Sequence, residues 1–327
     1  MNLSDDLDQS RLFSLLLHHN VGPLFKYMLP EGELPDNIQD ECTKLHMYFF
    51  SMNIKALRIV SKLFERLDTA EMDAVVMRGL TLAHSLYPDP GLRPMHDVDI
   101  LISPNSKDDF VRLMQDEGHV PVEKLRSQLV YRIDGITFEM HWWLLTAKRY
   151  RRAIESSPLL KNKKTLTLPD GRFYILSSED ELIGLISHAF IHHDCSRLTS
   201  LIDIALLIKR CDIDWNYIVS FCRRNHLTRM FFVCLAFVND LFDLEMEQVF
   251  HVFGISPNQV TGFFEAYRAQ LFGGLNLNNY FIRKRALIYV AKSPLLKVKQ
   301  LIRFFSASEF RAFREQIKIK PKTLRET

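Results

Sequence analysis

The stretch RPMHDVDILI, at residues 93–102, predicts a β-strand that carries two aspartates, and it is the most informative part of the sequence. Its second half alternates polar and apolar residues at the period of a β-strand, with Asp97 and Asp99 on either side of Val98. Side chains two residues apart on a strand point to the same face, so we expect the two carboxylates to lie together. Such a pair is repulsive, and a divalent cation such as Mg²⁺ between the oxygens relieves the repulsion. An exposed edge strand with polar outward positions is the alternative, and the apolar flanks argue against it.

A second acidic strand is predicted at residues 136–142, ITFEMHW. Glu139 and His141 share one face of this strand, while Phe138 and Met140 share the other. A third carboxylate on a neighbouring strand completes a pocket that can hold metal-bound phosphates. We therefore expect Glu139 to lie close to the two aspartates.

A strand-to-helix turn precedes both acidic strands. The apolar residues 74–77 predict a short strand that stops at Arg78 and Gly79, and residues 80–87 predict a helix. A glycine at such a turn lets the backbone approach a phosphate, and the helix N-terminus offers free N–H groups to it. One glycine is weak evidence, but the order strand, glycine, helix and two acidic strands is far more specific.

This order of elements resembles the polymerase-beta-like nucleotidyltransferase superfamily. The resemblance is closest to its uncharacterised nucleotidyltransferase family and covers roughly residues 70–210. It rests on MRG at 77–79, the Arg-Pro pair before the aspartates, EMHW at 139–142, and a later helix with two histidines followed by Asp203.

Two positions depart from the pattern of the superfamily. Gly79 is followed by Leu80 where a serine is usual, so the hydroxyl that would contact a phosphate is missing or comes from Thr81. Arg78 stands where a lysine is expected, which keeps the positive charge but replaces a point charge with a planar fork. These departures leave the predicted metal site intact.

The resemblance implies an α+β fold in which flanking helices cover a small mixed sheet. We expect an N-terminal helical region over residues 1–70, a nucleotidyltransferase-fold core over 71–177 and a C-terminal helical domain over 178–327. Turn signals predict two hairpins within the core, one over residues 128–142 and one over 165–176. A helix is expected from about residue 179 to 193, with Ser178 and Glu181 as its capping box.

The resemblance also implies an enzyme that uses Mg²⁺ or Mn²⁺. It would move NMP from an NTP to an acceptor hydroxyl of a peptide, protein, small molecule or RNA, with release of pyrophosphate. Asp97, Asp99 and Glu139 would be the catalytic residues and the metal ligands. The expected nucleotide-binding residues are Arg78, Gly79, Thr81, Arg93, His141, His188 and His192. Two alternatives remain: sugar transfer from a nucleotide sugar, and a non-catalytic nucleotide-binding partner in a tailoring or toxin–antitoxin system.

Three features of the predicted site also have structural interpretations: the histidine pair, Asp203 and Arg93. His188 and His192 share a helix face, where they either line the nucleotide pocket or form local hydrogen bonds. Asp203 lies in a strongly apolar helix and needs a partner, for which His188, His192, Arg197 or a metal-bound water are candidates. Arg93 can neutralise a triphosphate or pair with one of two nearby acids, Asp89 and Asp97.

The composition is that of an ordinary globular protein, with 47% hydrophobic and 25% charged residues. No run is apolar enough to predict a membrane span or a signal peptide. The five cysteines have no C-x-x-C spacing, which favours reduced thiols in the cytoplasm. Walker A and G-x-S-x-G motifs are absent.

The positive charge is concentrated near the C-terminus. Residues 283–327 contain 13 Lys or Arg against three acidic residues, a net charge of +10, and since the chain carries +3 the remainder carries −7. Aromatic residues interleave this basic tail. It could bind nucleic acid, anionic lipid or an acidic partner, but a solvated helical face is the interpretation we favour.

Overall fold

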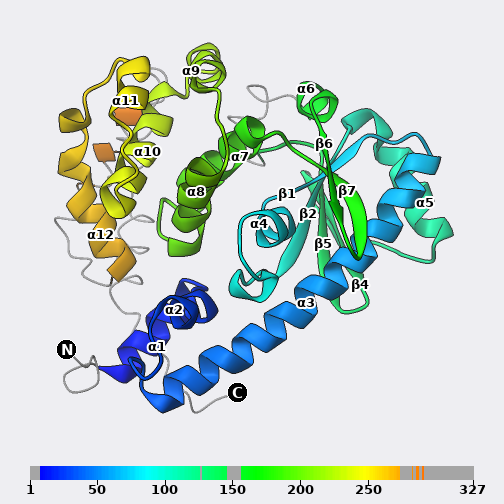
Figure 1. Cartoon of the computed structure of the whole chain (residues 1–327). Coiled ribbons are helices and arrows are strands. Elements are labelled where there is room, and N and C mark those ends of the chain that lie inside the picture. The colour runs from blue at the N-terminus through cyan, green and yellow to red at the C-terminus, as the bar shows by residue number, and fades with distance from the viewer. Residues whose placement is uncertain are drawn as a thin grey trace, which may run out of the picture.

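The computed structural model shows a mixed β-sheet flanked by helices, with a further group of helices beside it (Figure 1). The predicted α+β fold, with helical regions on both sides of the sheet in sequence, is confirmed. The residues described are 8–125, 127–145, 156–272, 282, 285, 286, 289 and 290. Apart from those last four residues, the basic tail predicted over 283–327 lies outside the described part of the chain.

Seven strands form one sheet in the order β3-β4-β5-β2-β1-β7-β6. The central strands β2 and β5 are parallel, β1 is antiparallel to β2, and β1 is parallel to β7. The bounds are β1 (Ala74–Met77), β2 (Asp97–Ile102), β3 (Glu123–Lys124), β4 (Gln128–Ile133), β5 (Ile136–His141), β6 (Lys164–Leu168) and β7 (Gly171–Ile175).

Both predicted hairpins are confirmed, as β4–β5 and β6–β7. Asp134 and Gly135 connect β4 to β5, with φ of 49° and 82°. Positive φ at both central residues is what a tight two-residue hairpin turn requires, and Asp-Gly is a favoured pair for it. The turn sets the register of β5, which carries Glu139 and His141.

The helices fall into an N-terminal, a core and a C-terminal group. The first contains α1 (Gln9–His18), α2 (Gly22–Met28) and α3 (Asp36–Thr69). The second contains α4 (Gly79–Ser85), α5 (Lys107–Asp116) and α6 (Ser156–Lys161). The third contains α7 (Ser178–Ile191), α8 (Leu198–Arg210), α9 (Trp215–Arg224), α10 (Thr228–Phe242), α11 (Glu247–Phe253) and α12 (Phe264–Phe272). Within the described residues, no helix combines the length and apolarity that crossing a membrane requires.

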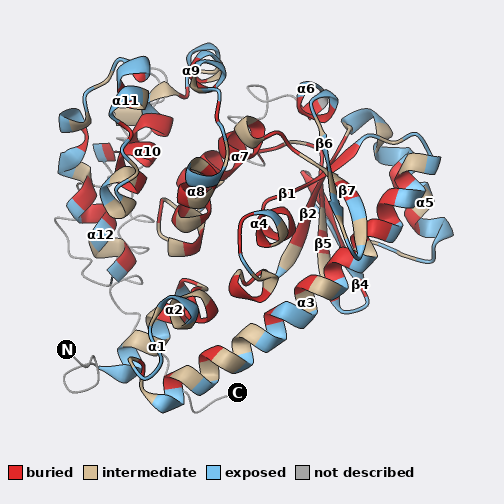
Figure 2. Cartoon of the chain, viewed as in Figure 1, coloured by how far each residue is buried: buried red, intermediate tan, exposed pale blue. Residues whose placement is uncertain are grey.

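Each face of the sheet has its own apolar core. Val98 and Ile100 of β2 pack with residues of α3 and α5, such as Phe64 and Phe110. Leu101 belongs to the other core, which contains the buried apolar residues of α7 and α10, two helices that are largely buried (Figure 2). Because successive residues of a strand alternate between faces, Asp97 and Asp99 lie on the face of Leu101, toward α7 and α8.

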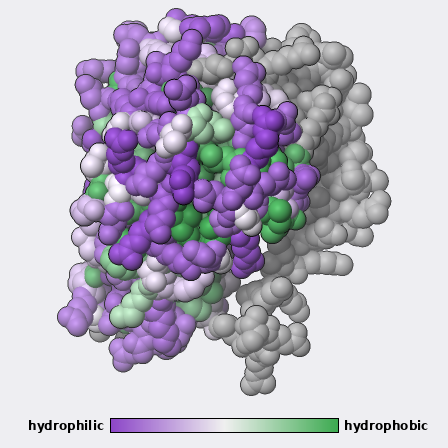
Figure 3. Space-filling view, turned by 90° about the vertical axis from the view of Figure 1, so that its right-hand side faces the viewer, coloured by the Kyte–Doolittle hydropathy of each residue, from purple (hydrophilic) through white to green (hydrophobic). Residues whose placement is uncertain are grey.

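The side of the molecule that carries α5 is mostly hydrophilic, with hydrophobic side chains gathered near its middle (Figure 3). Phe110 and Met114 of α5 are buried against the sheet, while Asp109 and Arg112 are exposed and form an ion pair one turn apart. α5 is therefore an amphipathic helix that packs its apolar side on the sheet and exposes its charged side.

The capping box predicted at Ser178 is wrong by one residue. Ser177 is the N-cap of α7, and its hydroxyl accepts a hydrogen bond of 3.1 Å from the backbone N–H of Asp180. Glu181 does not accept a hydrogen bond from the backbone N–H of the N-cap residue, as a capping-box residue would. Its carboxylate is buried and instead accepts the backbone N–H of Arg78 at 2.7 Å.

Candidate active site

The turn between β1 and α4 has an unusual backbone. Arg78 adopts φ 58° and ψ −124°, a conformation that strongly favours glycine. The hydrogen bond from its N–H to Glu181 holds this conformation. A Cβ on Gly79 would lie only 3.1 Å from a guanidinium nitrogen of Arg93, so the turn leaves little room for a larger residue. Strained backbone of this kind concentrates at functional sites.

The parallel register of β2 and β5 brings the predicted carboxylates together. Asp99 lies opposite Glu139, and Asp97 lies opposite Thr137. A cavity of about 310 Å³ opens on this face. Its lining includes all three predicted catalytic residues together with Arg78, Gly79, Arg93 and His188.

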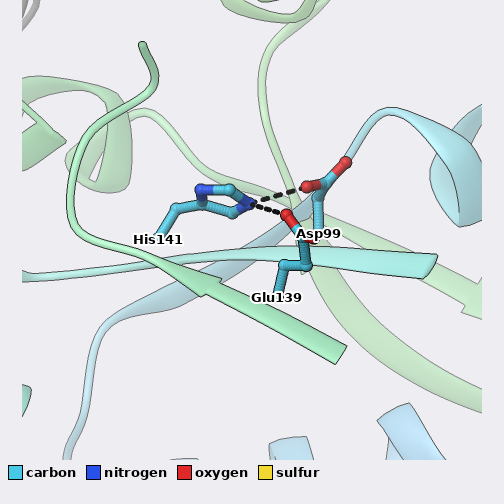
Figure 4. Close-up of side chains that lie close together, drawn as sticks. All are labelled: Asp99, Glu139 and His141. Carbon is cyan, nitrogen blue, oxygen red and sulfur yellow. Dashed lines mark hydrogen bonds and ion pairs between the residues drawn. The ribbon is translucent and has the colours of Figure 1, made fainter. Parts of the chain in front are cut away.

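One nitrogen of the His141 ring faces oxygens of both Asp99 and Glu139 (Figure 4). Its Nε2 is 2.7 Å from Asp99 Oδ1 and 3.4 Å from Glu139 Oε2. Gln128 on β4 donates a hydrogen bond of 2.7 Å to the same Glu139 oxygen. Both His141 and Asp99 are buried, with 2% and 8% of their surface exposed. The side chains are therefore fixed by contacts from three adjacent strands.

Positive charge reaches Asp99 from the strained turn. A guanidinium nitrogen of Arg78 lies 3.3 Å from Asp99 Oδ2 and 3.1 Å from His188 Nδ1. Burial alone would raise the pKa of Asp99, but Arg78 and His141 outweigh it and hold that pKa well below its usual range. Burial also lowers the pKa of His188 well below its usual value, which favours the neutral form of the ring. Its other nitrogen lies 3.0 Å from Nε2 of His193.

The pKa values of Asp97 and His141 are both raised. Burial and repulsion from Asp99 and Glu139 raise the pKa of Asp97 to about 6. Burial would lower the pKa of His141, but its hydrogen bonds to Asp99 and Glu139 raise it overall. For both groups the neighbouring carboxylates raise the pKa, and a cation bound among those carboxylates would relieve their repulsion.

Arg93 and Asp203 form a buried ion pair, which corrects two predictions. The guanidinium donates to Asp203 Oδ2 at 2.8 Å, and Tyr87 donates its hydroxyl to Oδ1 at 2.8 Å. The predicted partners of Asp203 were a histidine, Arg197 or a metal-bound water, and Arg93 was predicted either to neutralise a triphosphate or to pair with Asp89 or Asp97. Asp89 instead accepts hydrogen bonds from His46 and the backbone of Gly91. The difference arises because α8 packs its acidic residue directly against the loop before β2.

Three predicted nucleotide-binding residues, Thr81, His141 and His192, are not among the residues that line the cavity, although His141 contacts Asp99 and Glu139, which do. The hydroxyl of Thr81 donates to the carbonyl of Val76 at 3.2 Å, which ties α4 back to β1. The ring of His192 stacks on His188, with centroids 4.9 Å apart. Their assigned roles in nucleotide binding remain predictions.

Several residues that line or support the cavity were not predicted from the sequence to belong to the nucleotide or metal site. Arg197 and His193 also line the cavity, and Gln128 and Glu181 hold residues that do. For Glu181 a signal existed, because it lies seven residues before His188 and so shares its face of α7. For the others the sequence offers no comparable pattern.

A metal ion would fit among three of these side chains. One ligand atom each from Asp99, Glu139 and His141 lies within 4.8 Å of the others, the only such group among the described residues. Asp97 borders the same cavity but is outside the group. The donor set of two carboxylates and one imidazole is suited to a divalent cation.

A comparison with protein-family models matches residues 5–243 to a family described as uncharacterised nucleotidyltransferase. The chain belongs to this family. The segment that matches this family contains both acidic strands, the turn between β1 and α4, and α8. A search of curated proteins found no match.

Solved structures offer more distant likenesses to this family member. One is an antigenic nucleotidyltransferase-like protein from Paracoccidioides brasiliensis, with 18% identity, a TM-score of 0.42, and coverage of 62% of this chain and 94% of that one. Another is the antibiotic-resistance factor ANT(2'')-Ia, with 10% identity, a TM-score of 0.34, and coverage of 62% and 96%. Neither likeness bears on the substrate of this chain.

Proposed function

We propose that this chain is a metal-dependent nucleotidyltransferase that moves NMP from an NTP to an acceptor hydroxyl. The observation that carries the proposal is the register of β2 and β5, in which Asp99 lies opposite Glu139 with Asp97 on the same face. Three carboxylates on one face, next to a glycine turn at a helix start, form a site for metal-bound phosphates. Membership of the nucleotidyltransferase family supports the same reaction class.

The reaction forms a bond between the acceptor oxygen and the α-phosphorus and breaks the bond from that phosphorus to the pyrophosphate. Asp97, Asp99 and Glu139 would hold Mg²⁺ or Mn²⁺, which when bound neutralises the triphosphate and orients it. Glu139 accepts the proton of the acceptor hydroxyl or orients the group that does. The proton and the pyrophosphate then leave the site.

Cationic side chains support the leaving group. Arg78 lies at the mouth of the turn, and its guanidinium can move from Asp99 to a phosphate when a cation takes its place at that carboxylate. Arg93 keeps N–H groups free of Asp203, because an arginine has five donors and the ion pair engages only part of them. Gly79 lets the phosphate approach the backbone.

The experiment that tests this proposal compares the fate of two labels. The protein is incubated with each NTP labelled at either the α- or the γ-phosphate, with Mg²⁺ or Mn²⁺ and fractionated cell extract as the source of acceptor. Transfer of the α-label but not the γ-label to a macromolecule or small molecule supports the proposal and names the nucleotide. Transfer of the γ-label would instead indicate phosphoryl transfer.

The labelled fractions also divide the open acceptor classes of peptide, protein, small molecule and RNA. The control is Asp116→Asn, which changes an exposed acid at the end of α5, on the opposite face of the sheet. No transfer from any NTP, together with transfer from a nucleotide sugar, would replace the proposal with glycosyl transfer. No transfer from either donor, with metal-dependent nucleotide binding retained, would favour a non-catalytic binding partner.

A further inference from the structure

His141 was predicted from the sequence to bind nucleotide, but in the structure it occupies the position of a metal ligand. Its ring is buried, and Nε2 points at the oxygens of Asp99 and Glu139 (Figure 4). Nδ1 is also buried and has no hydrogen-bond partner within the described ranges. The polar contacts of this imidazole are therefore concentrated on the two carboxylates.

The distances suit shared coordination of one ion. Neighbouring ligands of an octahedral ion with bonds of about 2.1 Å are separated by about 3 Å. The two distances from His141 Nε2, 2.7 and 3.4 Å, lie on either side of that separation. Shifts of a few tenths of an ångström would bring both of these distances to that separation, and the three ligand atoms already lie within 4.8 Å of one another.

We propose that His141 is a direct metal ligand and that it makes the site selective for transition-metal ions, Mn²⁺ in particular, over Mg²⁺. This inference rests on the proposed function and names the class of cofactor that it uses. Mg²⁺ prefers a complete set of oxygen ligands and gains little from an imidazole. Carboxylates suit Mn²⁺ as well as Mg²⁺, but imidazole nitrogen favours transition metals, so a mixed donor set selects Mn²⁺.

A different role for His141 makes a different prediction. If His141 only donated a hydrogen bond to Asp99 and Glu139, it would hold the two carboxylates in place for any cation. Its loss would then weaken Mg²⁺ and Mn²⁺ binding to the same extent. A direct ligand changes the ratio of the two affinities, which a merely structural role does not.

The deciding experiment is electron spin echo envelope modulation of Mn²⁺ bound to the wild-type protein without nucleotide. Samples with ¹⁴N- and ¹⁵N-labelled histidine are compared. We expect modulation from a coordinated imidazole nitrogen that changes with the isotope and is lost in His141→Asn, whose shorter side chain does not reach the Nε2 position. Bound Mn²⁺ without that modulation overturns the inference, as does failure to bind Mn²⁺ at all.

Calorimetric titration of the metals gives the second readout. In His141→Asn we expect Mn²⁺ affinity to fall at least tenfold and Mg²⁺ affinity to change less than threefold, with melting curves used to confirm folding. The matched control is His119→Asn, which removes a histidine after α5 on the opposite face of the sheet. Equal losses for both metals would overturn the inference.

Both measurements omit nucleotide and acceptor. Imidazole-coordinated Mn²⁺ in a protein that transfers no label would leave this inference standing and remove the proposed function. Label transfer by a protein whose Mn²⁺ has no imidazole ligand would do the reverse.

Discussion

Replacing Asp203 with asparagine should destabilise the folded protein by about 3–5 kcal/mol, because it removes one partner of a buried ion pair. The Asp203 side chain is 1% exposed and that of Arg93 is 12% exposed, so water cannot replace the lost carboxylate charge. Asparagine has almost the same volume, and its oxygen can still accept the hydroxyl of Tyr87. The cost therefore isolates the uncompensated guanidinium rather than a cavity.

Urea unfolding followed by circular dichroism measures this change in the free energy of unfolding. Tyr87→Phe is the matched control, because it removes a neutral partner of Asp203 and leaves the ion pair intact. Losing this hydrogen bond to a charged acceptor should cost about 1.5–3 kcal/mol. Asp116→Asn, at an exposed position, should change the stability by less than about 0.5 kcal/mol. A cost below about 1 kcal/mol for Asp203→Asn would contradict this prediction and show that other groups compensate the charge of Arg93.

Two further predictions concern the strained turn and its support. Burial raises the pKa of Glu181 from 4.5 to about 7, so the folded state binds this proton more tightly and its contribution to stability falls as pH rises from 4.5 to 7. Glu181→Gln should remove this pH dependence of the unfolding free energy, which is worth up to about 3 kcal/mol. Urea unfolding of both proteins at pH 5 and pH 7.5 measures it, and parallel pH profiles would contradict the prediction. At residue 78, whose φ is 58°, Arg78→Gly should be more stable than Arg78→Ala by about 1–2 kcal/mol, since only glycine adopts this backbone without strain. Thermal melts of the pair test this, and equal melting temperatures would show that the turn is unstrained.

Local patterns in the sequence predicted most of the elements that carry the site. The alternation around Asp97 and Asp99 predicted β2, and the Asp-Gly pair predicted the β4–β5 hairpin and hence the register of Glu139 on β5. These succeeded because a period of two and a two-residue turn are decided by neighbouring residues. The division into three domains and the roles of the site residues remain predictions.

Contacts between distant segments could not be read in the same way. Arg93 and Asp203 are 110 positions apart, and their pairing depends on how α8 packs against the loop before β2. The sequence placed Glu139 and His141 on one face, but it did not show that Asp99 on a different strand would lie within hydrogen-bond distance of the imidazole. The positive φ of Arg78 had no signal either, because the residue type argues against it.

If the carboxylates of β2 and β5 catalyse nucleotidyl transfer, transfer should depend on Asp99. The most direct measurement is the rate of α-phosphate label transfer by Asp99→Asn beside wild type and Asp116→Asn, with folding of each confirmed by melting curves. Because a carboxylate that binds the metal is expected to be essential, the account predicts a loss of at least about a thousandfold for Asp99→Asn and an unchanged rate for Asp116→Asn. A folded Asp99→Asn protein that transfers label within about tenfold of the wild-type rate would contradict the account.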